Sequence, residues 1–318
     1  MKVRDLRALV TGGAGFIGSH LVDRLLENRK IVVCYDNFNP YYSGKEGNVK
    51  KHTGNPNYHL VRADILDFES LSQAVKDVDV VYHLAAQPGV RYSIEHPLEV
   101  TQINVCGTTN VLEAARQGKA TKIVYASSSS VYGNPESMPV SEDHPLRPIS
   151  PYGASKLAGE KYCQTYAKLY GMDIVMLRYF TVYGPRQRPD MAIRKFVTQI
   201  LDDRPPVIYG DGTQMRDFTY IDDIVAGTIA AAETRGSAGE AFNLGGGHRT
   251  SVNSLVQRLL KLCGKVGTLQ PVYEAAKLGD VENTHADIRK ASHALGYNPR
   301  TELDQGLKRF IEWCGLLS

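Results

Sequence analysis

Cysteine is scarce in this sequence, and its spacing suits neither a disulfide framework nor a metal site. The chain of 318 residues has five cysteines, with no Cys-x-x-Cys pair and no His/Cys cluster at zinc spacing, so we expect no metal. An odd number of cysteines without a framework is typical of reduced thiols in a cytoplasmic enzyme. The five are Cys34, Cys106, Cys163, Cys263 and Cys314.

Long apolar runs and long runs of one charge are also missing. No stretch approaches the roughly 20 apolar residues that a membrane span needs. The charged start, Met1–Arg7, leads directly into a predicted strand without an apolar signal segment. The net charge of +3 comes from interspersed Lys and Arg, with no basic run that would suggest a nucleic-acid surface. We therefore expect a cytoplasmic protein with no membrane partner and no nucleic-acid partner.

Short apolar runs alternate with helical patterns in the first part of the chain. This alternation predicts an α/β fold with a doubly wound parallel sheet that is covered on both faces. The predicted strands are Ala8–Thr11, Ile31–Tyr35, Tyr58–Arg62, Val80–Leu84, Lys122–Ala126 and Ile174–Leu177. The predicted helices are Phe16–Asn28, Leu66–Lys76, Leu98–Gln117 and Tyr152–Tyr170.

The pattern changes after about Arg178, where prolines and turn pairs cluster. We predict one domain over residues 1–180 and a smaller C-terminal lobe over 181–318, with some strands of the lobe returning to the main sheet. Helical patterns recur at Ser251–Cys263 and Thr301–Leu317.

A glycine-rich segment between the first strand and the first helix predicts a dinucleotide site. Gly12, Gly15 and Gly18 permit a tight turn and close approach to a pyrophosphate, and the helix N-terminus favours phosphate. Asp36 ends the second strand, where a carboxylate accepts hydrogen bonds from ribose hydroxyls and repels a 2′-phosphate. No Arg or Lys directly follows it. The pattern therefore indicates a Rossmann domain that prefers NAD to NADP.

A tyrosine and a lysine four residues apart predict proton-transfer chemistry. Tyr152 and Lys156 begin a helix and share one of its faces, and Ser128 follows the fifth strand. A phenol has a pKa near 10. A neighbouring ammonium and a positively charged nicotinamide ring would lower it, so that the phenol can act as a base in hydride chemistry.

These motifs together resemble the extended short-chain dehydrogenases/reductases, and among them the nucleotide-sugar 4-epimerases, over essentially the whole chain. Besides the glycine segment and the Tyr/Lys pair, the matching stretches are Leu84-Ala85-Ala86, Ser127–Gly133, Leu177–Phe180, Tyr183–Gln187 and Arg216-Asp217-Phe218. The resemblance implies an NAD-binding domain, a lobe that binds a UDP-sugar, and a homodimer. The cofactor set is Gly12, Gly15, Phe16, Ile17, Gly18, Asp36, Asn37, Asp64, Ile65, Leu84, Ala85, Ala86, Asn104, Ser127, Tyr152, Lys156 and Tyr179. The substrate set is Arg91, Ser128, Ser129, Ser130, Thr181, Arg188, Arg216, Lys277 and Asp280.

The residues after Ser128 bear on which sugar is used. Related 4,6-dehydratases carry Asp-Glu at the positions of Ser129 and Ser130, and related decarboxylases carry Glu at the position of Ser130. This chain has serine at both positions, so it lacks the acidic residues that these two reactions use. The hydroxyls of Ser129, Ser130 and Thr181 resemble those of glucuronate/galacturonate 4-epimerases. UDP-glucose remains an alternative substrate. Net dehydrogenation, with reduced cofactor accumulating, and a non-catalytic sensor of NAD or a nucleotide sugar are alternatives of other classes.

The role of Asp36 can be tested by removing its charge. We expect Asp36→Asn to weaken NAD retention and to gain some binding of NADP, because the carboxylate that repels a 2′-phosphate is gone. Cofactor content after purification and reconstitution with each dinucleotide measure this. Wild-type protein that carries or prefers NADP would contradict the assignment.

Overall fold

A seven-stranded sheet forms the core of the molecule. The computed structural model describes residues 6–277, 279 and 281–315. In spatial order the strands are β11 (Ala241–Leu244), β6 (Ile174–Tyr179), β5 (Lys122–Ser128), β4 (Val80–His83), β1 (Arg7–Thr11), β2 (Ile31–Asp36) and β3 (Tyr58–Arg62). All neighbours pair in parallel. The doubly wound parallel sheet that the sequence predicts is confirmed.

Side chains alternate between two hydrophobic clusters along the central strands, because successive residues of a strand point to opposite faces. On β1, Ala8 and Val10 belong to one cluster and Leu9 to the other. Helices α1 (Phe16–Glu27) and α9 (Ile221–Glu233) pack in the first cluster. Helices α3 (Phe68–Ala74), α6 (Gly107–Gln117) and α7 (Pro151–Tyr170) pack in the second. Both faces are thus buried, which explains the continuous apolar runs of the strands.

The helix predicted over Leu98–Gln117 is divided into three segments. It consists of α5 (Pro97–Thr101), a π-helical turn η1 (Gln102–Cys106) and α6. A π-turn adds one residue to the helical repeat and redirects the side chains within it. Here the turn contains Asn104, which is buried and bonded on three sides. Such a local change has no signal in the apolar periodicity on which the prediction rested.

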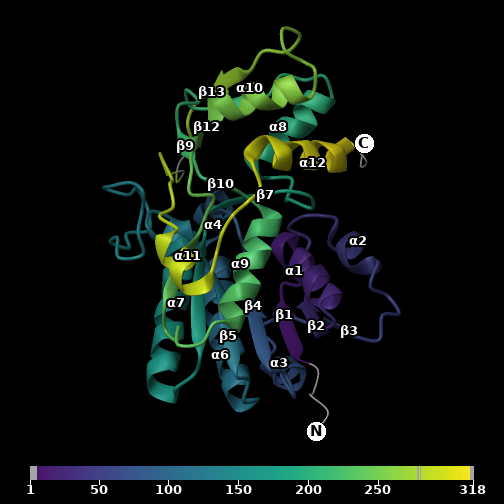
Figure 1. The fold of residues 1–318 in the computed structure, drawn as a ribbon, viewed down its shortest axis with the longest axis vertical. Coiled ribbons are helices and arrows are strands. Elements are labelled where there is room, and N and C mark those ends of the chain that lie inside the picture. The colour runs from purple at the N-terminus through teal and green to yellow at the C-terminus, as the bar shows by residue number, and fades with distance from the viewer. Residues whose placement is uncertain (1–5, 278, 280, 316–318) are drawn as a thin grey trace.

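A smaller lobe lies at the upper end of the molecule in Figure 1. Its helices α8 (Ala192–Leu201), α10 (Val252–Leu262) and α12 (Leu303–Gly315) contact one another. Three two-stranded sheets accompany them, namely β7 (Thr181–Tyr183) with β10 (Phe218–Tyr220), β9 (Met215–Arg216) with β12 (Thr250–Ser251), and β8 (Val207–Tyr209) with β13 (Val272–Glu274). The remaining helices are α2 (Lys45–Lys50), α4 (Val90–Glu95), η2 (Ser129–Val131) and α11 (Arg289–Leu295).

The chain returns from this lobe to the main sheet. Helix α9 packs against β5 and β6, and β11 pairs with β6 from Ala241↔Met176 to Leu244↔Tyr179. The domain division at residue 180 therefore stays a prediction. Residues 316 and 317 of the predicted last helix lie outside the described residues. Within the described part of the chain, no helix is both long enough and apolar enough to cross a lipid bilayer.

The strand order fixes where a ligand binds. β1 leads to β2 on one side, whereas β4, its other neighbour, leads to β5 on the opposite side. The connections that leave the carboxyl ends of β1 and β4 therefore diverge and open a crevice between them, which is the usual ligand site of open α/β sheets.

Candidate active site

The glycine turn after β1 forms the floor of a cleft at this crevice. Gly12 has a φ of +69°, and a Cβ on it would lie 2.8 Å from the Ala85 nitrogen, at the end of β4. A Cβ on Gly18 would overlap the carbonyl oxygen of Gly12. Only glycine lets this turn approach β4 and lets α1 begin so close to it. The first turn of α1 therefore faces the cleft with backbone N–H groups that have no partner inside the helix.

Asp36 is fixed at the end of β2 by two backbone amides. Its carboxylate accepts hydrogen bonds from the Ala14 nitrogen at 3.0 Å and from the Phe38 nitrogen at 2.8 Å, and the residue is buried. An ionised carboxylate has about four acceptor sites, so Asp36 keeps acceptor sites that the hydroxyls of a bound ribose could use. Asp64 lines the same cleft and accepts a bond of 2.7 Å from the Asn37 side chain.

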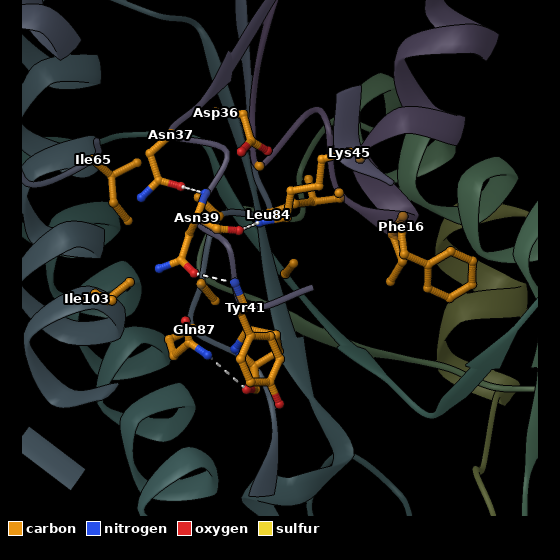
Figure 2. A pocket seen from close by; sticks show the side chains of 18 of the residues that line it. Phe16, Asp36, Asn37, Asn39, Tyr41, Lys45, Ile65, Leu84, Gln87 and Ile103 are labelled. Atoms are coloured by element: carbon orange, nitrogen blue, oxygen red, sulfur yellow. Dashed lines mark hydrogen bonds between the residues drawn. The ribbon is translucent and has the colours of Figure 1, made fainter. Parts of the chain in front are cut away.

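The loop after β2 brings further residues to the cleft that the sequence did not single out. Figure 2 shows Asn39, Tyr41 and Lys45 on the walls of the cleft together with Asp36, and also Gln87 from the segment after β4. Asn39 accepts a bond from the Tyr41 nitrogen, and the Lys45 ammonium donates to the Asn39 carbonyl at 2.8 Å. No Arg or Lys directly follows Asp36 in the sequence, but the loop folds back and brings the Lys45 cation to the same cleft.

Helix α7 delivers the predicted base to the other end of the cleft. Ser150 caps the helix by accepting a bond of 3.1 Å from the Gly153 nitrogen, and Pro151 occupies the first turn. Tyr152 and Lys156 consequently both line the cleft, beside the end of β5. The Lys156 ammonium is buried and donates to the Ala126 carbonyl at 2.8 Å. Burial lowers the pKa of Lys156 to about 8.

The electrostatics at Tyr152 differ from the sequence-based expectation. Burial raises the pKa of its phenol, and the Arg188 charge and a hydrogen bond with Ser128 act in the opposite direction. The Lys156 ammonium, which was expected to lower this pKa, is directed to the carbonyl of Ala126. Arg188 is thus the cation that acts on the phenol, and it is held by a two-point ion pair with Asp190 at 2.9 and 3.0 Å.

A second cavity of about 550 Å³ adjoins the cleft, within the range of small-molecule sites. Ser128, Ser129, Ser130 and Thr181 contribute hydroxyl-bearing side chains to its lining. The Ser128 hydroxyl donates a hydrogen bond to the Ser130 hydroxyl at 3.1 Å. Several residues line both cavities, which places them at the junction: Phe16, Ile17, Tyr41, Pro88, Ser127, Tyr152, Tyr179 and Arg188.

The predicted cations lie in different places around the second cavity. Arg91 and Arg216 line it, and the Arg216 guanidinium donates to the carbonyls of Val281 and Glu282 at 2.7 and 2.9 Å. The Arg216 side chain thereby fixes one wall. Lys277 is not among the lining residues. Its ammonium lies 4.7 Å from the ring centre of Tyr209, which does line the cavity. Asp280 lies outside the described residues.

Asn104 is the one predicted cofactor residue that does not reach the cleft. Its side chain accepts from the Gln87 nitrogen at 2.7 Å and donates to the Gln87 carbonyl and to the Ser155 hydroxyl. The π-turn directs it behind the wall, where it holds Gln87 in place. The other predicted cofactor residues all line the cleft.

Comparisons with known proteins agree with this geometry. The family model described as GDP-mannose 4,6 dehydratase matches residues 9–310. The UDP-glucuronate 4-epimerase of Thermodesulfobacterium geofontis is 42% identical over 311 residues, covering 96% of this chain and 95% of that protein.

Two solved structures are similar over nearly all of both chains. The UDP-glucuronic acid 4-epimerase of Bacillus cereus, in complex with UDP-glucuronic acid and NAD, has a TM-score of 0.93 and 44% identity, covering 98% of this chain and 100% of that chain. The UDP-glucose 4-epimerase of Thermotoga maritima, with UDP-glucose, has a TM-score of 0.92 and 35% identity, covering 98% and 99%.

Proposed function

The chain belongs to the GDP-mannose 4,6-dehydratase family of extended short-chain dehydrogenases/reductases, and we propose that within this family it is an NAD-dependent UDP-glucuronate 4-epimerase. The observation that carries the proposal is the place of Tyr152, at the junction of a dinucleotide cleft and a cavity with several serine and threonine hydroxyls. The similarity to epimerases that bind UDP-glucuronic acid and NAD supports it.

The cleft fits NAD. The glycine turn leaves room for a pyrophosphate against the start of α1, and Asp36 offers acceptors to the adenosine ribose. Asp64 and Ile65 line the adenine side, and Ala85 and Ala86, which follow Leu84, present small side chains where the dinucleotide crosses the sheet. When bound, NAD supplies the acceptor for the hydride of carbon 4 and the donor that returns it.

The chain's own residues move the proton. The Tyr152 oxygen takes the proton of the sugar's 4-hydroxyl as carbon 4 becomes a keto carbon, and Ser128 holds that oxygen by a hydrogen bond. The charge of Arg188 favours the phenolate, and we propose that the Lys156 ammonium adds to it once substrate and cofactor are bound. The flat 4-keto sugar turns over in the cavity, and Tyr152 returns the proton to the oxygen once carbon 4 has been reduced on its other face. The reaction therefore inverts carbon 4 without net oxidation.

The cavity wall favours epimerisation of a uronate over the other reactions of the family. Ser129 and Ser130 occupy the positions at which dehydratases carry an acid pair, so elimination of a 6-hydroxyl lacks its groups. Serine and threonine hydroxyls at positions 129, 130 and 181 are suited to donate to a carboxylate on carbon 5. UDP-glucose is the second candidate substrate, because the Thermotoga maritima epimerase is also similar over the whole chain.

We expect Tyr152→Phe to lower epimerase activity at least about 100-fold, because the ring still packs but the ionisable oxygen is gone. NAD content should stay normal, since Lys156 and the glycine turn are unchanged. Product formation from UDP-glucuronate and cofactor content per protein are the measurements. A variant that turns over close to the wild-type rate would remove Tyr152 from the mechanism.

Thr181 tests the preference for a uronate. Oxidation at carbon 4 of a uronate gives a β-keto acid, which loses carbon dioxide when the carboxylate bond stands perpendicular to the carbonyl plane. We propose that Ser129, Ser130 and Thr181 hold the carboxylate away from that alignment. A hydrogen bond to a charged acceptor contributes about 1.5–3 kcal/mol, which is about tenfold or more in binding.

We therefore expect Thr181→Val, which removes only the hydroxyl, to weaken the use of UDP-glucuronate far more than that of UDP-glucose. It should also release some 4-keto-pentose. UDP-glucose serves as the internal control, and carbon dioxide or pentose is measured alongside. An equal fall on both sugars, or wild-type protein that acts only on UDP-glucose, would favour the second candidate.

We also place the enzyme in the cytoplasm as a homodimer. All five cysteines are free, which supports a reducing compartment. Helix α5 exposes Leu98 at 86%, and α7 exposes Tyr162 and Leu169. The two helices contact each other and expose apolar side chains near both ends of the pair, which suits a self-complementary interface that runs along them.

The dimer is tested by the paired variant Leu98→Glu/Leu169→Glu. We expect light scattering to give a dimer for wild-type protein and a monomer for the variant, because charge on apolar residues of an interface opposes association. Val266→Glu, an exposed apolar residue of the other lobe, is the matched control and should stay dimeric. A wild-type monomer, or a dimer that persists in the variant, would contradict this interface.

A further inference from the structure

A buried ion pair lies directly behind the proposed proton-transfer residues. Glu160 of α7 is fully buried and Arg178 of β6 is 3% exposed. Two parallel hydrogen bonds join them, from the arginine Nε at 2.9 Å and from Nη2 at 2.8 Å. Glu160 stands four residues after Lys156 and therefore on the same face of the helix. The mechanism described above does not use this pair.

The pair belongs to a continuous network of hydrogen bonds. The Ser127 hydroxyl donates to Glu160 Oε1 at 2.6 Å, and Arg178 Nη1 donates to the Tyr132 hydroxyl at 2.9 Å. Tyr132 in turn donates to the Asn243 side chain at 2.7 Å. The network thus connects the end of β5, helix α7, β6 and β11, and every element that carries a proposed proton-transfer residue is joined to it.

Stability alone does not account for two buried charges. Removing charges from water is expensive, and replacing a buried pair by apolar residues of similar volume is often neutral or stabilising. An apolar pair could not accept a directional hydrogen bond from Ser127, which is the neighbour of Ser128. It also could not place a negative charge one helical turn from Lys156.

We propose that Glu160, held by Arg178, is a positioning residue for proton transfer, which fixes the end of β5 through Ser127 and sets the charge environment of Lys156. This deepens the proposed epimerase function and rests on it. No part of Glu160 touches the cleft. It acts through Ser127 on the alignment of the Ser128 hydroxyl, and through space on the ammonium of Lys156.

The charge of Lys156 depends on few neighbours. Burial lowers its pKa to about 8, and Cys163 and Glu160, both from α7, act in the opposite direction. From β5, the Tyr125 ring lies 5.1 Å from the ammonium, and from β4, His83 is within electrostatic reach. Burial raises the pKa of the Cys163 thiol far above neutral, so the negative charge of this set lies on Glu160, which is ion-paired with Arg178 of β6. Loss of its charge lowers the pKa of Lys156 further, and the ammonium is then lost at a lower pH.

The test compares variants that separate charge from shape. Glu160→Gln keeps the acceptor for Ser127 but removes the charge. We therefore expect the high-pH limb, the part of the pH profile where kcat falls as pH rises, to lie lower by roughly half a pH unit to one pH unit. Glu160→Asp keeps the charge but withdraws the acceptor from Ser127. We therefore expect kcat to fall roughly 10- to 100-fold, while the pH of the high-pH limb stays at the wild-type value. NAD content should be normal in both.

The matched control is Asp173→Asn, which breaks a second ion pair at the opposite end of β5. There the buried Lys122 ammonium lies 2.8 Å from Asp173. This variant should lower the unfolding midpoint and leave the pH profile unchanged. If Glu160 were merely structural, its variants would behave in the same way, and a folded Glu160→Gln enzyme with the wild-type limb would overturn the proposal.

Two further measurements keep the proposal testable whatever the single variants do. If Glu160→Gln does not fold, the paired variant Glu160→Gln/Arg178→Met removes both charges. We expect it to fold and to show the lowered limb, and full wild-type kinetics in it would overturn the proposal.

An NMR titration of the Lys156 side-chain signal, identified by its absence in Lys156→Arg, needs no substrate. It should show a lower midpoint in Glu160→Gln, and an unchanged midpoint would contradict the role of Glu160. Inactivity of the wild-type protein would instead contradict the epimerase function and leave this titration interpretable.

Discussion

The close approach of helix α7 to strand β5 is the constraint on which the site depends. A Cβ on Gly153 would lie 2.5 Å from the Ser130 carbonyl oxygen, and one on Gly159 would overlap the Tyr125 hydroxyl. Glycine at both positions lets the helix lie directly against the strand end. Tyr152 and Lys156, which flank Gly153, are thereby held beside the serines that follow β5. A larger separation would leave the phenol and the serine hydroxyl without a shared substrate oxygen.

This contact also explains how one site serves a two-part reaction. The cleft at the glycine turn and the larger cavity meet at Tyr152, so hydride and proton can leave the same carbon–oxygen unit toward different walls. The base is buried, which raises the pKa of the phenol, and the Arg188 charge offsets part of that rise. Arg188 comes from the segment after β7 and Tyr152 from α7, so the ionisation of the phenol depends on both parts of the chain.

Much of the fold and part of the site could be predicted because their signals are local. The glycine turn, the carboxylate of Asp36 and the four-residue spacing of Tyr152 and Lys156 lie within single strand–helix units. The apolar runs likewise marked six of the seven strands of the main sheet to within two residues, whereas β11 was not assigned. Lys45 and Tyr41 were missed because their place depends on a loop held by side-chain-to-backbone bonds. The approach of Arg188 to Tyr152 and the π-turn at Asn104 depend on tertiary packing, which periodicity does not report.

The central claim is that carbon 4 is oxidised and reduced again within one closed site. It is tested most directly with UDP-glucuronate that carries deuterium at carbon 4, incubated with purified protein without added cofactor and followed by NMR. The account predicts UDP-galacturonate that retains the deuterium at carbon 4, because the hydride that leaves is the one that returns. Loss of the label to water, or no change of configuration at carbon 4, would contradict it.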